Sequence, residues 1–207
     1  MQMKIMQTMT SRTGRHMQRY NEGCRQVVGC IPFRLKHRRE SAIIHGNLLE
    51  NIEVLLISSQ KGPHKLMCPK GGWELNEELE EAASRETFEE AGVLGMVMGG
   101  ELGVWNFKSN SQGIIHEGRM LPMYVQDERD AWPEKNVRQR FWMSIDEARE
   151  RCAHSWMKEA IDVFIARLIS IKMKGKGSTC LREFLLINDK NGIASIKGED
   201  EFEFCLC

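Results

Sequence analysis

Residues 71–93 read GGWELNEELEEAASRETFEEAGV. This pattern predicts a glycine-rich loop that leads into an acidic helix. Asn76 is the expected N-cap, because an asparagine side chain can accept a hydrogen bond from a free amide of the first helical turn. Gly92 is the expected end of the helix, because glycine readily takes the left-handed conformation common at that position.

Three glutamates of this helix are expected to share one face. Glu86, Glu89 and Glu90 stand at positions i, i+3 and i+4, which a helix brings to one side. The simplest reading of an acidic run is a solvated face. Like charges so spaced destabilise a bare helix by roughly 0.2–0.5 kcal/mol per pair, and a hard divalent cation with oxygen ligands would offset that repulsion. Arg85, four residues from both Glu81 and Glu89, could hold a carboxylate in position.

The spacing of these residues resembles the Nudix box, G-x5-E-x7-R-E-U-x-E-E-x-G-U, in which U is aliphatic. The matching positions are Gly71, Glu77, Arg85, Glu86, Glu89, Glu90, Gly92 and Val93. Thr87 stands where an aliphatic residue is usual. The resemblance implies an α+β Nudix fold, in which a mixed β-sheet is sandwiched between helices (α/β/α). It also implies structural roles in the box for Gly71, Gly72, Glu77 and Gly92.

The resemblance further implies a metal-dependent hydrolase that acts on phosphoanhydrides. Glu86, Glu89 and Glu90 would hold Mg2+, with Mn2+ as the alternative, and Glu89 is the candidate base. Arg85 completes the catalytic set. Water is expected to attack directly, because no Ser, Cys or His with a partnered base stands out in the sequence.

Stretches outside the box resemble plant Nudix hydrolases over about residues 11–168. They are RQVVGCIPFR, PKGGWE, GVWNFKS, WPEKNVRQRFW and EARERC followed by WMKEA. These enzymes are similar to animal diphosphoinositol polyphosphate phosphohydrolases, which also cleave diadenosine polyphosphates. Such a polyanionic small-molecule substrate requires cationic side chains. The candidates are Lys70, Arg138, Arg140, Arg25, Lys61 and Lys65.

Two of these expectations rest on position along the chain. Lys70 abuts Gly71 and should therefore lie near the metal. Arg138 and Arg140 are expected on one face of a strand, because side chains two residues apart in a strand point the same way.

Two other functions stay open on the sequence alone. One is an ADP-ribose or NADH pyrophosphatase, although such enzymes resemble one another in carrying proline shortly after the box and residues 94–115 contain none. The other is a non-catalytic Nudix-fold binding module. Such modules usually lose box carboxylates, whereas this chain keeps all of them.

Composition limits the class of partner. The 207 residues include 29 Lys+Arg and 29 Asp+Glu, a balance that argues against general binding to nucleic acid or to a membrane surface. We expect a monomer or a weak homodimer. Seven cysteines without metal-ligand spacing indicate reduced thiols, and hence a cytoplasmic protein. The alternative location is mitochondrial, because residues 1–20 are basic and lack acids.

We expect the chain to divide into a basic N-terminal arm (1–20), a Nudix domain (21–173) and a partly disordered linker and tail (174–207). Within the domain, strands are expected at 25–35, 52–59, 102–107, 118–126 and 138–143, with a loop at 60–72. Ser144 and Glu147 form a capping-box pattern that opens one helix, and residues 154–173 form another. Pro32 and Pro122 suggest that their strands lie at an edge or contain a bulge.

Overall fold

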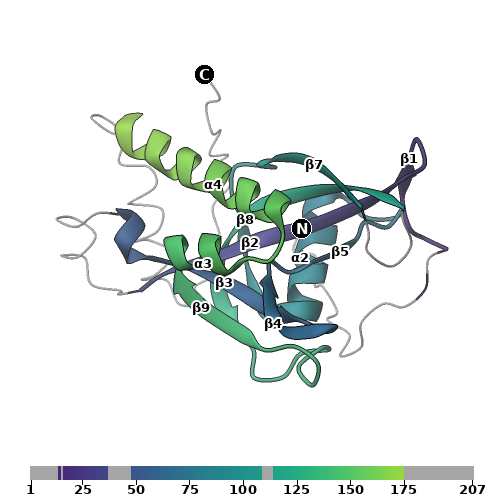
Figure 1. Cartoon of the computed structure of the whole chain (residues 1–207), viewed down its shortest axis with the longest axis horizontal. Helices are drawn as coiled ribbons and strands as arrows, with labels where there is room; N and C mark the ends of the chain where they lie inside the picture. Colours follow the sequence, from purple (N-terminus) through teal and green to yellow (C-terminus); the bar gives the residue numbers. More distant parts are fainter. Residues whose placement is uncertain (1–13, 15, 37–47, 109–113, 175–207) are drawn as a thin grey trace, which may run out of the picture.

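The computed structural model describes residue 14 and residues 16–36, 48–108 and 114–174 (Figure 1). In this part of the chain a single sheet holds nine strands in the order β4-β3-β2-β8-β6, with β1 and β5 paired to β2, β7 to β8 and β9 to β3. The elements are β1 (Tyr20–Asn21), β2 (Cys24–Leu35), η1 (Leu48–Asn51), β3 (Ile52–Ser59), β4 (Gly62–Met67), β5 (Lys70–Gly72), α2 (Leu79–Ala91), β6 (Val93–Val97), β7 (Gly103–Lys108), β8 (Ile115–Glu128), β9 (Arg140–Ser144), α3 (Ile145–Arg151) and α4 (Ser155–Lys174).

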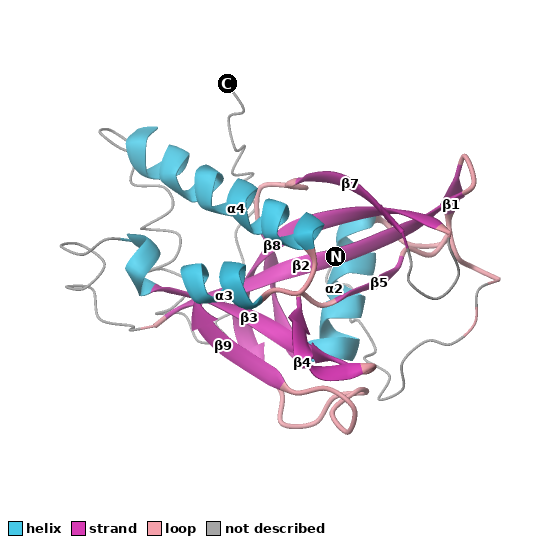
Figure 2. Ribbon diagram, viewed as in Figure 1, coloured by secondary structure: helices cyan, strands magenta, loops and turns pink. Residues whose placement is uncertain are grey.

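Two long strands form the centre of the sheet. β2 and β8 run parallel, and every other strand pair is antiparallel. Helix α2 covers one face, where its Ala82 and Ala83 join Val28 and Cys30 of β2 in an apolar cluster. Helices α3 and α4 cover the other face (Figure 2), where Phe164 packs against the core. The predicted mixed sheet between helices is confirmed.

Pro32 and Pro122 lie in the two central strands, so the edge alternative is wrong. The register with β8 shifts where Leu94 and Gly95 face Asp127 and Val125, so the irregularity in β8 is not at Pro122, and the β2–β8 register is regular through both prolines. On one side of β2, the pairing with β5 ends at Gly29 and the pairing with β3 begins at Phe33. Pro32 lies in this gap. On the far side of β8, β7 pairs up to Met120 and β6 pairs from Met123, and Pro122 lies between them. Each proline therefore occupies a place where its strand changes neighbour and no ladder donor is needed.

The expected loop at 60–72 is also wrong, because it contains β4 and β5. These strands lack the alternation that predicts a strand: β4 reads GPHKLM, with three exposed residues in a row, and β5 has only three residues. Their pairing with β3 and β2 comes from the tertiary fold. Strand β6, which follows the box helix directly, was not expected from the sequence either.

The other expected elements are confirmed within one to three residues at their ends. Ser144 caps α3 through a hydrogen bond from the Glu147 amide, and α4 places Trp156, Phe164 and Leu168 in the core. Residues 1–13, 15 and 175–207 lie outside the described residues, and with them most of the expected arm and tail. No helix among the described residues is long and apolar enough to cross a bilayer.

Candidate active site

The box helix begins later than expected. Glu78, not Asn76, is the N-cap of α2, and Glu78 and Glu81 form a reciprocal capping box. The residues before it form a turn, which Trp73 closes by donating from Nε1 to the Glu77 carbonyl at 2.9 Å. The other end is as predicted: Gly92 takes the left-handed conformation (φ 64°), and its amide donates to the Phe88 carbonyl.

Arg85 joins the loop of the box to its helix. Its Nε and Nη2 donate to the two carboxylate oxygens of Glu77 at 2.5 and 2.9 Å, and Nη2 also donates to the Gly72 carbonyl at 3.0 Å. Its Nη1 donates to Glu86 Oε1 at 2.7 Å and reaches Glu89 Oε1 at 3.5 Å. The expected contact with Glu81 is not the one formed. One planar guanidinium thus orients three carboxylates.

Glu90 is the most deeply enclosed of the three candidate metal ligands. Its Oε2 accepts from the Lys70 amide at 2.8 Å, and its Oε1 accepts from Arg138 Nη2. Burial raises the pKa of Glu90 to about 7, against the opposing charges of Lys70 and Arg138. The protein therefore holds a carboxylate where its negative charge is only partly compensated.

Glu86 and Glu89 complete the carboxylate group on the same helix turn. Burial raises the pKa of Glu86, an effect that the Arg85 charge opposes and the Glu89 charge reinforces. Glu89 is 6% exposed. As expected from their spacing, the three carboxylates are close enough for their charges to interact, since Glu86 also raises the pKa of Glu90.

The two glycines that open the box allow close approach of the backbone. A Cβ on Gly71 would overlap the Glu86 carboxylate. A Cβ on Gly72 would overlap Gln18 Oε1. The absence of a side chain at Gly71 lets the Glu86 carboxylate lie directly against β5, and its absence at Gly72 makes room for the Gln18 side chain.

The expectation that Arg138 and Arg140 share one face of a strand is wrong, because β9 starts only at Arg140. Arg138 precedes it and is buried, with bonds to Glu90, to Glu134 Oε2 at 2.6 Å and to the Ser58 carbonyl at 3.1 Å. The guanidinium carbon of Arg140 lies 4.1 Å from the centroid of the Trp132 ring. The roles of both in binding phosphate stay predictions.

The remaining cationic candidates are spread around the box. Lys70 lies in β5, where its amide holds Glu90. Lys65 is exposed on β4, and Lys61 is exposed in the turn before it. Arg25, on β2, donates from Nε to Gln18 Oε1 at 2.8 Å, next to Gly72. The structure therefore brings Lys70 and Arg138 to the carboxylates.

Sequence reasoning missed two supporting residues. Gln18 donates to the carbonyls of Gln26 and Trp73, at 2.9 and 2.8 Å, and so fastens the box loop to β2. Glu134 accepts from both Arg138 and Gln60. The i, i+4 spacing of Glu134 and Arg138 was a signal for the contact between these two residues. Nothing in the sequence indicated the contacts of Gln18.

The donor set fits a hard divalent cation. The carboxylates of Glu86, Glu89 and Glu90 supply only oxygen, the ligand type that Mg2+ and Mn2+ prefer, and the loss of hydration raises the pKa of Glu86 and Glu90 despite the cations beside them. Within the described residues, no three acidic, His or Cys side chains are already arranged as a metal cluster. Arg85 and Arg138 occupy carboxylate oxygens that a cation would take over. Such a cation would neutralise phosphoryl charge and acidify a bound water.

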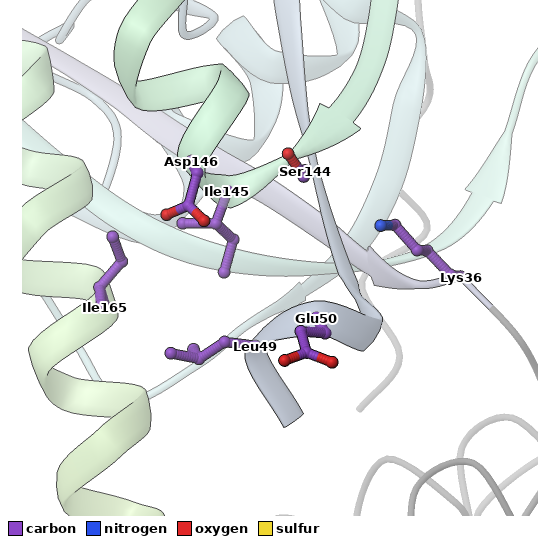
Figure 3. Close-up of a pocket in the computed structure, with 7 residues that line it drawn as sticks. All are labelled: Lys36, Leu49, Glu50, Ser144, Ile145, Asp146 and Ile165. Carbon is purple, nitrogen blue, oxygen red and sulfur yellow. The ribbon is translucent and has the colours of Figure 1, made fainter. Parts of the chain in front are cut away.

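A separate hollow of about 290 Å³ lies between η1, the start of α3 and α4 (Figure 3). Lys36, Glu50 and Asp146 give it charges of both signs, and Leu49 and Ile165 give it apolar walls. None of the box carboxylates lines it. It is therefore distinct from the candidate active site.

Comparison with known proteins agrees with this geometry. The NUDIX domain model matches residues 37–164. Nudix hydrolase 18, mitochondrial, from Arabidopsis thaliana is 56% identical over 166 residues, which cover 80% of this chain and 90% of the relative. Nudix hydrolase 17, mitochondrial, from the same plant is 57% identical over 162 residues, 78% of this chain and 85% of the relative.

A more distant relative and a solved structure complete the comparison. Diphosphoinositol polyphosphate phosphohydrolase 3-alpha from Mus musculus is 35% identical over 129 residues, 61% of this chain and 68% of that protein. A C. elegans Ap4A hydrolase binary complex shares the fold, with a TM-score of 0.52 at 19% identity over 70% of this chain and 98% of the other. The chain is a Nudix hydrolase and belongs to the family that this domain defines.

Proposed function

We propose that this Nudix hydrolase cleaves phosphoanhydride bonds in diphosphoinositol polyphosphates, diadenosine polyphosphates or both, by direct attack of water. Enzymes of the family generally use a divalent metal, and we assign Mg2+ as the preferred ion with Mn2+ as a substitute. Glu86, Glu89 and Glu90 hold the cation, and Arg85 positions Glu86 and Glu89.

The observation that carries this proposal is the burial of like charges on one turn of α2. Glu86 and Glu90 are enclosed strongly enough to raise the pKa of both carboxyl groups. A buried, partly compensated charge is unfavourable, and a divalent cation together with phosphate is the partner that offsets it. The mouse relative, a diphosphoinositol polyphosphate phosphohydrolase, supports an inositol polyphosphate as substrate.

The test is an assay of the purified full chain on three substrates. A diphosphoinositol pentakisphosphate and diadenosine hexaphosphate represent the proposed classes, and ADP-ribose represents the main alternative. Turnover is expected for at least one of the first two with Mg2+, and its loss with EDTA. Inertness toward both, with either metal present, would overturn the proposal, and turnover of ADP-ribose alone would favour the pyrophosphatase alternative.

A matched pair of variants separates an enzyme from a binding module. Glu90→Gln is expected to lower kcat by more than about 100-fold, the upper end for residues that only support metal ligands. Glu159→Gln, on the exposed side of α4, removes a carboxylate far from the box and should leave kcat unchanged. Equal activity of the two variants would refute the assignment of Glu90.

Location and assembly are part of the same proposal. Two relatives at 56% and 57% identity are named mitochondrial, which favours mitochondria over the cytoplasm for this chain. A C-terminal fluorescent fusion of the full chain, compared with one in which Arg12, Arg15 and Arg19 are replaced by Gln, tests this. We keep a monomer or weak homodimer as the expected assembly, to be measured by light scattering.

A further inference from the structure

The arginines around the carboxylate site already have acidic partners. Arg85 binds Glu77 and Glu86. Arg138 binds Glu90 and Glu134. Arg140 Nη1 lies 3.3 Å from Glu128 Oε1. Moving a buried guanidinium away from its partner leaves that carboxylate uncompensated, which costs several kcal/mol. These arginines are therefore poorly suited to receive the distal charges of a large polyanion.

Two lysines beside the box have the opposite property. Among the described residues, neither Lys65 nor Lys70 has a carboxylate within ion-pair distance of its ammonium group. Lys70 is half-buried and Lys65 is exposed. Only two residues separate β4, which carries Lys65, from β5, which carries Lys70. Both ammonium groups can therefore accept an anion without breaking an existing ion pair.

The backbone places His154 beside the segment that joins β4 to β5. Leu66 of β4 forms a parallel bridge with Cys152, and the Ala153 amide donates to the Leu66 carbonyl at 2.8 Å. Because the bridge is parallel, His154, two residues after Cys152, lies toward Cys68, two residues after Leu66. Cys68 stands between Lys65 and Lys70 in the sequence, so His154 starts from a backbone position between those of the two lysines.

The electrostatic effect of Lys70 reaches both the carboxylates and His154. The Lys70 charge lowers the pKa of Glu86 and Glu90. It also lowers the pKa of His154, after burial and together with Lys65. Lys70 therefore acts on both the carboxylate site and His154. The two ammonium charges disfavour protonation of His154, and an anion bound beside them would favour it.

We propose that Lys65, Lys70 and His154 form a cationic track that binds the phosphate groups of the substrate beyond the one attacked at the box. The track selects substrates with many phosphates over short diphosphates. This inference rests on the proposed function, because it assigns the part of the same site that recognises the rest of the polyanion. Lys158 is left out, because its Nζ already donates to the Glu150 carbonyl at 3.0 Å.

Kinetics with substrates of different length test the track. Lys65→Gln and His154→Gln are each expected to raise KM for diadenosine hexaphosphate and for a diphosphoinositol pentakisphosphate about tenfold, the effect of losing one charge-assisted hydrogen bond. For diadenosine triphosphate KM should change less than twofold, and kcat should hold for all three. Lys36→Gln and His64→Gln remove an exposed lysine and an exposed histidine outside the track and should change nothing. An unchanged KM for the long substrates, or an equal rise for all three, would overturn the inference.

Binding without turnover separates failure of the track from failure of the proposed function. Inositol hexakisphosphate, added to metal-free protein, is expected to bind the wild type more tightly than Lys65→Gln, and to raise the pKa of His154 in an NMR titration. If neither substrate class is hydrolysed but this binding pattern holds, the proposed function fails and the track stands. If the wild type hydrolyses a long substrate but both variants bind inositol hexakisphosphate as it does, the track fails. Circular dichroism of each variant confirms that it is folded.

Discussion

Arg138 donates to the carboxylate of Glu90, and this contact joins the segment before β9 to the box helix. Both side chains are less than one-tenth exposed. The same guanidinium holds Glu134 and the Ser58 carbonyl, so one residue links the helix, β3 and the loop that leads to β9. Its position makes it a support of the carboxylate site.

Loss of this support should be costly. Arg138→Leu leaves Glu90 and Glu134 without their cation and is expected to lower the free energy of unfolding by about 3–5 kcal/mol, measured by urea denaturation without metal. Arg149→Leu breaks an exposed ion pair with Asp162 and should have no measurable effect. Similar midpoints for the two variants would show that Arg138 does not support the fold.

The raised pKa of Glu90 predicts how stability depends on pH without metal. Because the folded pKa is about 7 against an ordinary 4.5, the folded state keeps a proton that the unfolded state loses. The contribution of this group to stability therefore falls as pH rises from about 4.5 to 7, by about 3 kcal/mol in all.

Glu90→Gln imitates the protonated side chain and should remove this dependence. The variant is expected to match the wild type at pH 5 and to be more stable at pH 8, as measured by chemical denaturation in EDTA. Mg2+ should restore the stability of the wild type at pH 8 and should stabilise the variant less. A difference in stability between the two proteins that does not change with pH would show that the pKa of Glu90 is not raised in the folded state.

Close packing of Gly71 against Glu86 gives a third prediction. Gly71→Ala places a methyl group where the Glu86 carboxylate lies, so the carboxylate must move. A displacement of about 1 Å at a catalytic group can lower kcat on the order of 100-fold. Gly62→Ala, whose new Cβ would meet only the Lys65 side chain at 3.6 Å, should keep wild-type kcat. Full activity of Gly71→Ala would show that Glu86 does not need its present position.

Replacement of Arg85 tests whether the planar shape of the guanidinium matters. Lys keeps the charge but cannot bind both oxygens of Glu77 and also reach Gly72 and Glu86. Arg85→Lys is expected to lower kcat by about 100-fold with a smaller change in KM. Arg151→Lys, at an exposed pair with Glu147, is the control. Similar kcat and KM for the two variants would show that Arg85 contributes only its positive charge.

The sequence predicts best where local rules and the tertiary fold agree. The ends of β2, β3 and α4, the Gly92 stop and the shared face of Glu86, Glu89 and Glu90 follow from periodicity and glycine chemistry. The start of α2 does not, because the turn closed by Trp73 and Glu77 delays the helix beyond Asn76.

Most misses involve contacts between distant segments. β5 is a strand because three residues pair with β2, which no local pattern reveals. Arg138 was expected on a strand that starts two residues later, and its partner Glu90 is 48 residues away. His154 gains its charged neighbours only when the turn after α3 lies along β4.

The two central prolines constrain how the chain can be assembled. Cys30 donates toward β5, so the nitrogen of Pro32, two residues on, faces the same side; likewise the carbonyl of Pro122 accepts from Met98 on the β6 side. If β3 or β6 slipped along its neighbour into either gap, a carbonyl would face a nitrogen with no proton to give. Misaligned pairings are thus penalised during folding, and the register of β3 and β6 along the two central strands is set partly by two missing protons.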